Sequence, residues 1–356
     1  MKKLDLKTLV KHKRNQLQTT VNDKRHHRVH KKAAWWNINR AIINNGWELT
    51  KENRKLCDEY ATRVFGRKEY APWLYFFTLF SDEFKEGWIP LNYYARYILP
   101  DSSLTRVSIM KTFSKIVLKT EALPDVGYYL NGKFYNNDFK LISISELRKM
   151  VDEKYGEIIV KRDNSLQGLN NYNLSVDQIT LETFEGIGNC VIQYLVTDHE
   201  FFRKIVDSST ATIRIATVRN LEGEMEFRGS YLKLGRIGHQ EYRSDDGIRV
   251  PVLDESGELS AFCYSYDFKK FSAHPDTKVT LANNKIPRFG DAVKFCLELH
   301  TKIPHFPIVG WDVTIDHQEN IKLFEWNAGA PHPDIKVLQA TIGPCFRGLG
   351  WEESWK

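Results

Sequence analysis

The chain has 356 residues, of which 42% are hydrophobic and 27% are charged. This composition is ordinary for a globular protein, and without a long apolar run it excludes a mainly disordered or membrane-spanning chain. The basic start has no apolar signal core behind it, and five scattered cysteines without CxxC spacing fit reduced thiols. We therefore expect a cytoplasmic protein with two or three structural units.

Positive charge is concentrated at the start, where residues 1–32 contain eleven Lys or Arg and two Asp residues. Such an arm can attach peripherally to an anionic membrane surface at the inner face, or it can be an ordinary solvated helix. It has no aromatic residue before Trp35 with which to stack on bases. No specific nucleic acid is therefore expected as a partner.

Residues 34–100 carry apolar side chains at helical spacing, including an aromatic cluster between Tyr70 and Phe84. A cluster of this kind is typical of a packed core. Pro100-Asp101 then marks a boundary. The pattern predicts a helical N-terminal domain.

The next segment predicts a helix over Met110–Glu121 and strands over Val126–Leu130 and Lys133–Tyr135 around the Asn131-Gly132 turn. A helix over Ile144–Tyr155 and a strand over Glu157–Lys161 follow. The polar loop 163–171, with Gly168 at its centre, comes next. Its backbone N–H groups can converge on phosphate oxygens while Lys161 supplies positive charge. It lacks the Walker A order, and a plain turn between two strands explains it equally well.

The segment Val191–Glu200 reads as an apolar strand whose backbone can meet a purine edge, or simply as a buried strand. Ala211–Arg219 alternates with period two and places Arg214 in mid-strand, either holding an anion or facing solvent at a sheet edge. Three cations follow closely in FRGSYLKLGRIG: Arg228, Lys233 and Arg236. Strands over Gly247–Val252 and Glu258–Cys263 and a helix over Asp291–Thr301 complete this region.

The stretch Ile308–Pro333 predicts a hairpin with a turn at His317–Asn320. If these four residues make the turn, Asp316 pairs with Ile321 and Asp312 lies opposite Glu325. Asn327 then shares their face. Two carboxylates and an amide oxygen are ligands that suit magnesium, although an acidic face that only meets solvent gives the same spacing.

In this order the features resemble the ATP-grasp superfamily, from about Lys111 to Asn327. The resemblance is closest to the sugar-transfer-associated proteins of the teichuronic acid type, through SSTATIRIATVRN, RSDDGIRV and GWDVTID…LFEWNAG. It implies an α+β ATP-grasp fold, with two α+β subdomains gripping ATP, preceded by an α-helical N-terminal domain. The expected boundaries are 1–105, 106–197 and 198–356.

The resemblance also implies roles for individual residues. Magnesium would be bound by Asp312, Glu325 and Asn327. Many ligases of the superfamily have an arginine two positions before the metal aspartate. This chain has Gly310 there. Arg214 is therefore expected to contact an acyl phosphate, assisted by Arg228 or Arg236. The expected ATP contacts are Lys111 (with Lys115 as a competitor), Lys161, the loop residues Asp163, Ser165 and Gly168, the hinge residues Gln193, Tyr194 and Leu195, and Glu200 at the ribose.

The implied activity is that of an ATP-dependent carboxylate–amine ligase, which forms an amide through an acyl phosphate. Its substrate would be a sugar acid or an amino-acid-like molecule in surface polysaccharide biosynthesis. Two alternatives remain open: a kinase that phosphorylates a hydroxyl, and a non-catalytic nucleotide-binding protein with a basic arm.

Overall fold

The computed structural model describes residues 6–99, 102–165, 171–238, 242–243, 245–329 and 334–354. The chain forms two compact units, one of residues 1–98 together with 339–356 and the other of residues 99–338. The sequence did not predict that residues 339–356 belong with the first unit, and the expected boundaries at 105 and 197 stay predictions. Within the described ranges, no helix has the length and apolarity needed to cross a membrane.

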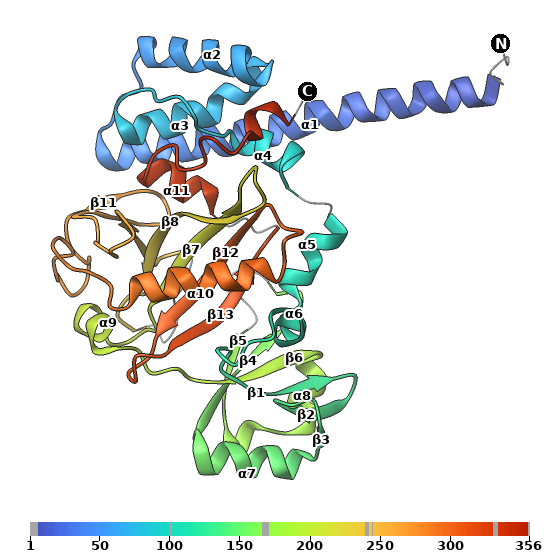
Figure 1. Ribbon diagram of the computed structural model, residues 1–356, viewed down its shortest axis with the longest axis vertical. Helices are drawn as coiled ribbons and strands as arrows, with labels where there is room; N and C mark the ends of the chain where they lie inside the picture. Colours follow the sequence, from blue (N-terminus) through green and yellow to red (C-terminus); the bar gives the residue numbers. More distant parts are fainter. Residues whose placement is uncertain are drawn as a thin grey trace. The chain divides into compact units, whose positions relative to one another are not determined.

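The first unit is helical (Figure 1). Residues with clear capping preferences mark both ends of its second helix. The side chain of Thr50 accepts a hydrogen bond from the N–H of Asn53 at the start of the second helix, and Gly66 ends that helix with φ 74°. The aromatic cluster is the core, as predicted: Trp73, Phe76 and Phe77 are all buried. The elements are α1 (Leu6–Asn45), α2 (Lys51–Phe65), η1 (Lys68–Tyr70), α3 (Ala71–Ser81), α4 (Leu91–Tyr97) and η4 (Trp351–Glu353).

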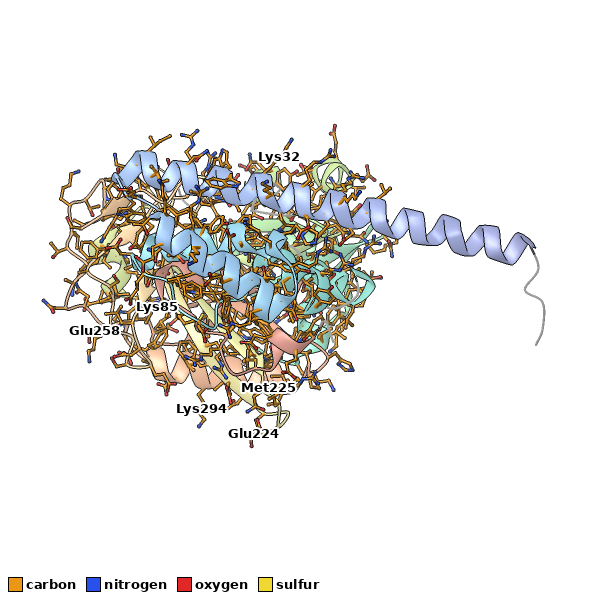
Figure 2. All side chains as sticks on the ribbon, turned by 90° about the horizontal axis from the view of Figure 1, so that it is seen from above. Lys32, Lys85, Glu224, Met225, Glu258 and Lys294 are labelled. Atoms are coloured by element: carbon orange, nitrogen blue, oxygen red, sulfur yellow. The ribbon has the colours of Figure 1, made fainter. Side chains whose placement is uncertain are left out.

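Helix α1 is long, and its described side chains have two different environments. Ala34, Ile38 and Ala41 are buried, so its second half packs into the helical unit. Lys31 and Lys32, which precede them, are exposed, and Lys32 is labelled in Figure 2. This is the behaviour of a solvated helix face, and contact with a membrane stays a prediction.

The second unit begins with helical segments and contains a six-stranded antiparallel sheet in the order β3-β2-β1-β6-β4-β5. The Asn131-Gly132 turn is confirmed, with positive φ at both residues. The predicted helix Met110–Glu121 is shorter than expected because Lys119 is left-handed and ends it. The elements are α5 (Ser102–Ile109), η2 (Lys111–Phe113), α6 (Ser114–Leu118), β1 (Asp125–Leu130), β2 (Lys133–Asn136), β3 (Leu141–Ile142), α7 (Ile144–Lys154), β4 (Glu157–Arg162), β5 (Asn171–Ser175), η3 (Val176–Gln178), α8 (Leu181–Ile187) and β6 (Cys190–Tyr194).

A seven-stranded antiparallel sheet in the order β11-β10-β9-β8-β7-β12-β13 follows. One face is apolar and packs against α10, whose Val293 and Cys296 join that core while Lys294 points away (Figure 2). The predicted strand Glu258–Cys263 is wrong: Leu259 forms only an isolated bridge, and a strand begins at Cys263. The elements are α9 (Glu200–Ile205), β7 (Thr212–Arg219), β8 (Met225–Leu234), β9 (Ile248–Val252), β10 (Cys263–Tyr264), β11 (Lys270–Phe271), α10 (Phe289–Thr301), β12 (Ile308–Ile315), β13 (Ile321–Asn327) and α11 (Ile335–Thr341).

The β12–β13 hairpin places Asp312 opposite Glu325, as predicted, but by a different register. Ile315, rather than Asp316, pairs with Ile321, so the turn is one residue longer than expected. Asp316 instead uses its side chain to accept hydrogen bonds from the backbone of the turn. A β-bulge at Phe324 inserts one extra residue in β13 and restores the pairing.

Candidate functional site

The polar face of the seven-stranded sheet gathers charged side chains from adjacent strands. Arg214 on β7 lies directly opposite Asp312 on β12, and Asp312 lies opposite Glu325 on β13. Opposed residues share a face, so the three side chains point to the same side of the sheet. The guanidinium of Arg214 holds Asp312 in a bidentate contact, with Nε to Oδ1 at 2.6 Å and Nη2 to Oδ2 at 2.9 Å.

Lys233 on β8 completes this ion cluster. Its Nζ donates to both oxygens of Asp312, at 2.8 and 3.0 Å. Burial alone would raise the pKa of Asp312, but the charges of Arg214 and Lys233 hold that pKa well below its usual value. Burial, followed by the charge of Arg214, lowers the pKa of Lys233. The sequence named Lys233 only as one of several cations and did not assign it a partner.

The three predicted magnesium ligands lie together on this face. Asn327 Nδ2 is 3.4 Å from Glu325 Oε1, and Glu325 is half-buried. Their oxygens suit a hard cation. Asp312 fits only if it changes partners, because Arg214 and Lys233 already occupy its four lone-pair positions. Within the described ranges, no group of three or more His, Cys, Asp or Glu side chains is placed to hold a metal ion, so the magnesium site stays a prediction.

The second group of predicted residues lies on the six-stranded sheet. Gln193 is buried on β6, opposite Asp125 on β1, and its Nε2 donates to Asp125 Oδ1 at 2.8 Å. Burial raises the pKa of Asp125, while its hydrogen bonds and the charge of Lys161 act in the opposite direction. Lys161 on β4 pairs with Val191 of β6, two residues before Gln193, so Lys161 and Gln193 share a face of the sheet. This polar patch is where the nucleotide contacts were expected.

Lys111 and the described part of the phosphate loop are joined by hydrogen bonds. Lys111 Nζ donates to the backbone oxygen of Ser165 at 3.2 Å. Asp163 is buried and accepts from the N–H and hydroxyl of Thr112, at 3.1 and 2.7 Å. Asp163 thus fastens the loop to η2, a structural role that the sequence did not predict. Gly168 lies outside the described residues.

The expected competitor of Lys111 has another partner. Lys115 Nζ is 2.8 Å from Glu121, an exposed acid at the end of the same segment. Lys111, which contacts the loop, therefore remains the better candidate for a phosphate contact.

The expected adenine hinge begins at the end of β6. Tyr194 stacks on Tyr155 with ring centroids 5.4 Å apart, and its N–H donates to the backbone oxygen of Pro124 at 3.0 Å. Leu195 is 40% exposed, so it is open to a ligand. Glu200 is exposed at the start of α9, where it pairs with Lys204 at 3.1 Å.

Arg228 and Arg236 have acidic partners of their own. Arg228 pairs with Glu226 on the same strand. Arg236 donates through Nε to Asp276 at 2.6 Å, and its Nη2 also contacts that carboxylate. Arg214 therefore contacts Asp312 directly, whereas the contacts described for Arg228 and Arg236 are with other acids.

A contact between the two sheets places Lys161 against β13, beside the charged cluster. Lys161 Nζ lies 5.3 Å from the ring centroid of Phe324, the bulged residue that precedes Glu325. Lys322 on β13 similarly lies 5.9 Å from the ring of Tyr194. Lys322 was not among the predicted site residues, although its position in the second strand of the hairpin could have indicated it.

This segment also matches a known family. Residues 150–345 match the model described as "Sugar-transfer associated ATP-grasp". The chain belongs to this ATP-grasp family. Membership confirms the resemblance to the sugar-transfer-associated ATP-grasp proteins. It also confirms the predicted α+β ATP-grasp fold with helices before it. No curated protein matches the chain.

Solved structures similar to this ATP-grasp chain are distant. An N5-carboxyaminoimidazole synthase from Aspergillus clavatus, in complex with ADP and 5-aminoimidazole ribonucleotide, has 12% identity and a TM-score of 0.39, with 65% of this chain and 47% of that chain covered. The biotin carboxylase domain of Hydrogenobacter thermophilus 2-oxoglutarate carboxylase, with MgADP and bicarbonate, has 12% identity and a TM-score of 0.41, covering 70% and 46%. An N5-carboxyaminoimidazole ribonucleotide synthetase from Thermotoga maritima has 11% identity and a TM-score of 0.42, covering 80% and 56%. The chain thus spans about half the length of these structures.

Proposed function

We propose that the chain is an ATP-dependent ligase that joins a carboxylate to an amine through an acyl phosphate. The observation that carries the proposal is the charged cluster of Arg214, Lys233, Asp312 and Glu325, which the Phe324 contact connects with Lys161. Phosphoryl transfer to a carboxylate brings several negative oxygens together. Buried cations that are held in place before the reaction stabilise such a charge at little reorganisation cost.

In the first step, a carboxylate oxygen of the substrate forms a bond to the γ-phosphorus of ATP, and the bond from that phosphorus to the β–γ bridging oxygen breaks. ADP leaves with the electron pair of that bond. Lys161 and Lys111 bind the phosphates, and Arg214 orients the carboxylate through Nη1, because its Nε and Nη2 already bind Asp312. Protein side chains form no covalent bond to the substrate.

In the second step, the amine nitrogen attacks the carbonyl carbon of the acyl phosphate. The carbon–oxygen bond to phosphate breaks, and inorganic phosphate leaves with the electron pair of that bond and with the proton that the nitrogen loses. Arg214 and Lys233 stabilise the negative charge on the departing phosphate. Exclusion of water from this face protects the acyl phosphate from hydrolysis.

A magnesium ion would be held by Glu325 and Asn327, with Asp312 as the third ligand. When bound, it offsets negative charge on the phosphate oxygens during transfer. Asp312 would contribute a ligand only by releasing Lys233, whose ammonium would then be available to an anion. Lys233 thus has a partner in both situations.

The substrate class that we propose is a sugar acid or an amino-acid-like molecule, in surface polysaccharide biosynthesis. The support is the family description, which places related chains with sugar transfer, and the anion-binding chemistry of Arg214. The cytoplasmic location belongs to the same proposal.

The decisive experiment incubates the protein with ATP, magnesium and candidate acids, with and without hydroxylamine. An acyl phosphate intermediate is expected to yield a hydroxamate and ADP, whereas a kinase yields a stable phosphorylated alcohol. Asp312→Asn and Glu325→Gln should each abolish hydroxamate formation, because each removes a charge that the site uses. Asp291→Asn, a matched change at an exposed acid on α10, should leave it unchanged. Full hydroxamate formation by either site variant would contradict the assignment.

A further inference from the structure

Residues 21–45 of helix α1 have one packed side and one exposed side. A helix turns by about 100° per residue, so residues three, four or seven apart lie close together around its axis. Four side chains on one side are buried: His27, Ala34, Ile38 and Ala41. The opposite side is exposed from Val21 to Ile43. Because the packed side is held by the helical unit, the exposed side is presented in a fixed direction.

The exposed side of α1 is basic. Its exposed cations are Arg25, Arg28, Lys32 and Arg40. They follow one another at three, four and eight residues, which keeps them on one face of the helix. Asp23 is the only acid in residues 21–45 of the sequence. It belongs to the packed side, where its carboxylate lies 2.6 Å from Arg67 Nη1.

Apolar side chains are lined up among these cations. Val29, Trp36 and Ile43 are seven residues apart, which is almost two helical turns, so they form a row along the same face. They are 55%, 43% and 75% exposed. The guanidinium of Arg40 lies 5.6 Å from the ring centroid of Trp36, so charge and apolar surface are adjacent. Single exposed apolar residues are ordinary, but a contiguous row marks an interaction surface.

A lipid bilayer with anionic headgroups matches both properties of this face. Negative headgroups attract Lys and Arg side chains near the surface. The boundary between headgroups and acyl chains accepts Trp and aliphatic side chains. Arg25 and Ile43 are about 27 Å apart along the helix axis, so a helix that lies flat brings the whole face to one surface. Nucleic acid offers the same negative charge, but its phosphate backbone gives the apolar row nothing to bury against.

We propose that this basic–apolar face of α1, made of Arg25, Arg28, Val29, Lys32, Trp36, Arg40 and Ile43, binds an anionic lipid bilayer peripherally. The helix axis lies parallel to the membrane. The four cations contact the headgroups, and the three apolar side chains enter the boundary with the acyl chains. This inference concerns where the chain is held, and it does not depend on the proposed ligase reaction.

The test is co-sedimentation of the full chain with vesicles of phosphatidylcholine alone, or of equal parts phosphatidylcholine and phosphatidylglycerol. The wild type should bind only the mixed vesicles, and less tightly as salt screens the charges. A variant with Arg25→Gln, Arg28→Gln and Lys32→Gln should bind about fivefold more weakly for each charge removed, or about a hundredfold in total. All three side chains are exposed, so the fold should persist.

The matched control removes three exposed lysines from elsewhere in the chain, through Lys133→Gln, Lys154→Gln and Lys294→Gln. It has the same net charge as the first variant and should bind the mixed vesicles like the wild type. Equal binding by the two variants would show that the face of α1 is not the contact surface, and it would overturn the proposal.

Two more variants separate the contributions of charge and apolar surface. Arg25→Lys combined with Arg28→Lys keeps both charges and should bind like the wild type. Trp36→Ala removes no charge, so it should weaken binding severalfold and leave the salt dependence unchanged. The proposal also fails if the wild type ignores mixed vesicles, or binds both kinds of vesicle equally. Binding to a random-sequence DNA duplex, with none to vesicles, would assign the face to nucleic acid instead.

Discussion

Lys161, through the ring of Phe324, is one of the side chains that connect the two sheets at the proposed nucleotide site. Lys161→Ala should weaken ATP binding by about 1.5–3 kcal/mol, which is the usual contribution of a hydrogen bond to a charged group. Because Lys161 is on the half-buried polar side of β4 and not in the core, the fold should persist. Equilibrium binding of a fluorescent ATP analogue measures the change.

The matched control is Lys149→Ala on α7, where the lysine is exposed and paired only with Glu153 at 3.8 Å. It should leave nucleotide affinity unchanged. Equal affinity of the wild type and Lys161→Ala would remove Lys161 from the phosphate site.

At the same scale, the sequence was a good guide to residues that are close in the chain and a poor one to distant pairs. Asp312, Glu325 and Asn327 belong to one hairpin, so their spacing predicts their shared face. The contact between Arg214 and Asp312 depends on β7 lying beside β12, which no local pattern specifies. The contact of Lys233 with Asp312 was missed for the same reason, although the sequence named the lysine.

Among the elements, the segment after β6 is tied to the start of the turn of the β12–β13 hairpin by Asp198. This buried residue accepts from the hydroxyl of Thr314 at 3.1 Å and from the N–H of Ala211, and it forms an isolated bridge with Asp316. Burial raises the pKa of Asp198 to about 7. The folded protein therefore binds a proton more tightly here than the unfolded chain does.

The sign of the resulting pH dependence follows from that difference. Between the ordinary pKa of an aspartate and about 7, the folded state holds the extra proton, so stability falls as pH rises, by up to about 1.4 kcal/mol per pH unit. Asp198→Asn should flatten this part of the curve. Urea unfolding from pH 4 to pH 8 measures the effect, and an unchanged slope would contradict the assignment.

In the β12–β13 hairpin, the pairing of Asp312 with Glu325 was predicted correctly, although the predicted length of the turn was wrong. A turn longer by one residue would have moved Glu325 away from Asp312, since one step of register reverses the face of every side chain. The bulge at Phe324 cancels that step. Neither feature has a distinct signal in the sequence, because Phe324 reads like any other strand residue.

For the molecule as a whole, the notable feature is that residues 339–356 complete the first unit. Gln339 is fully buried and makes two hydrogen bonds to the backbone of Ile89, accepting from its N–H at 2.7 Å and donating to its oxygen at 2.9 Å. Gln339→Ala would leave both groups unsatisfied, at a cost of about 1–3 kcal/mol each. The helical unit should then open more readily.

Hydrogen exchange followed by mass spectrometry measures this locally. Peptides around Ile89 should exchange faster in Gln339→Ala, whereas peptides from β12 should not. Gln318→Ala, at an exposed position in the hairpin turn, is the control and should leave both unchanged. Equal protection around Ile89 in all three proteins would show that the C-terminal segment does not hold the unit together.

The same return of the chain has a consequence for synthesis on the ribosome. Domains generally fold as they emerge, the N-terminal one first. Here the hydroxyl of Tyr93 donates to the backbone oxygen of Trp351 at 2.8 Å, across a sequence separation of 258 residues, so these helices wait for partners that are translated much later. The described strands of the ATP-grasp unit all precede Trp351 in the chain. The helical unit therefore starts before the ATP-grasp unit and is completed after it.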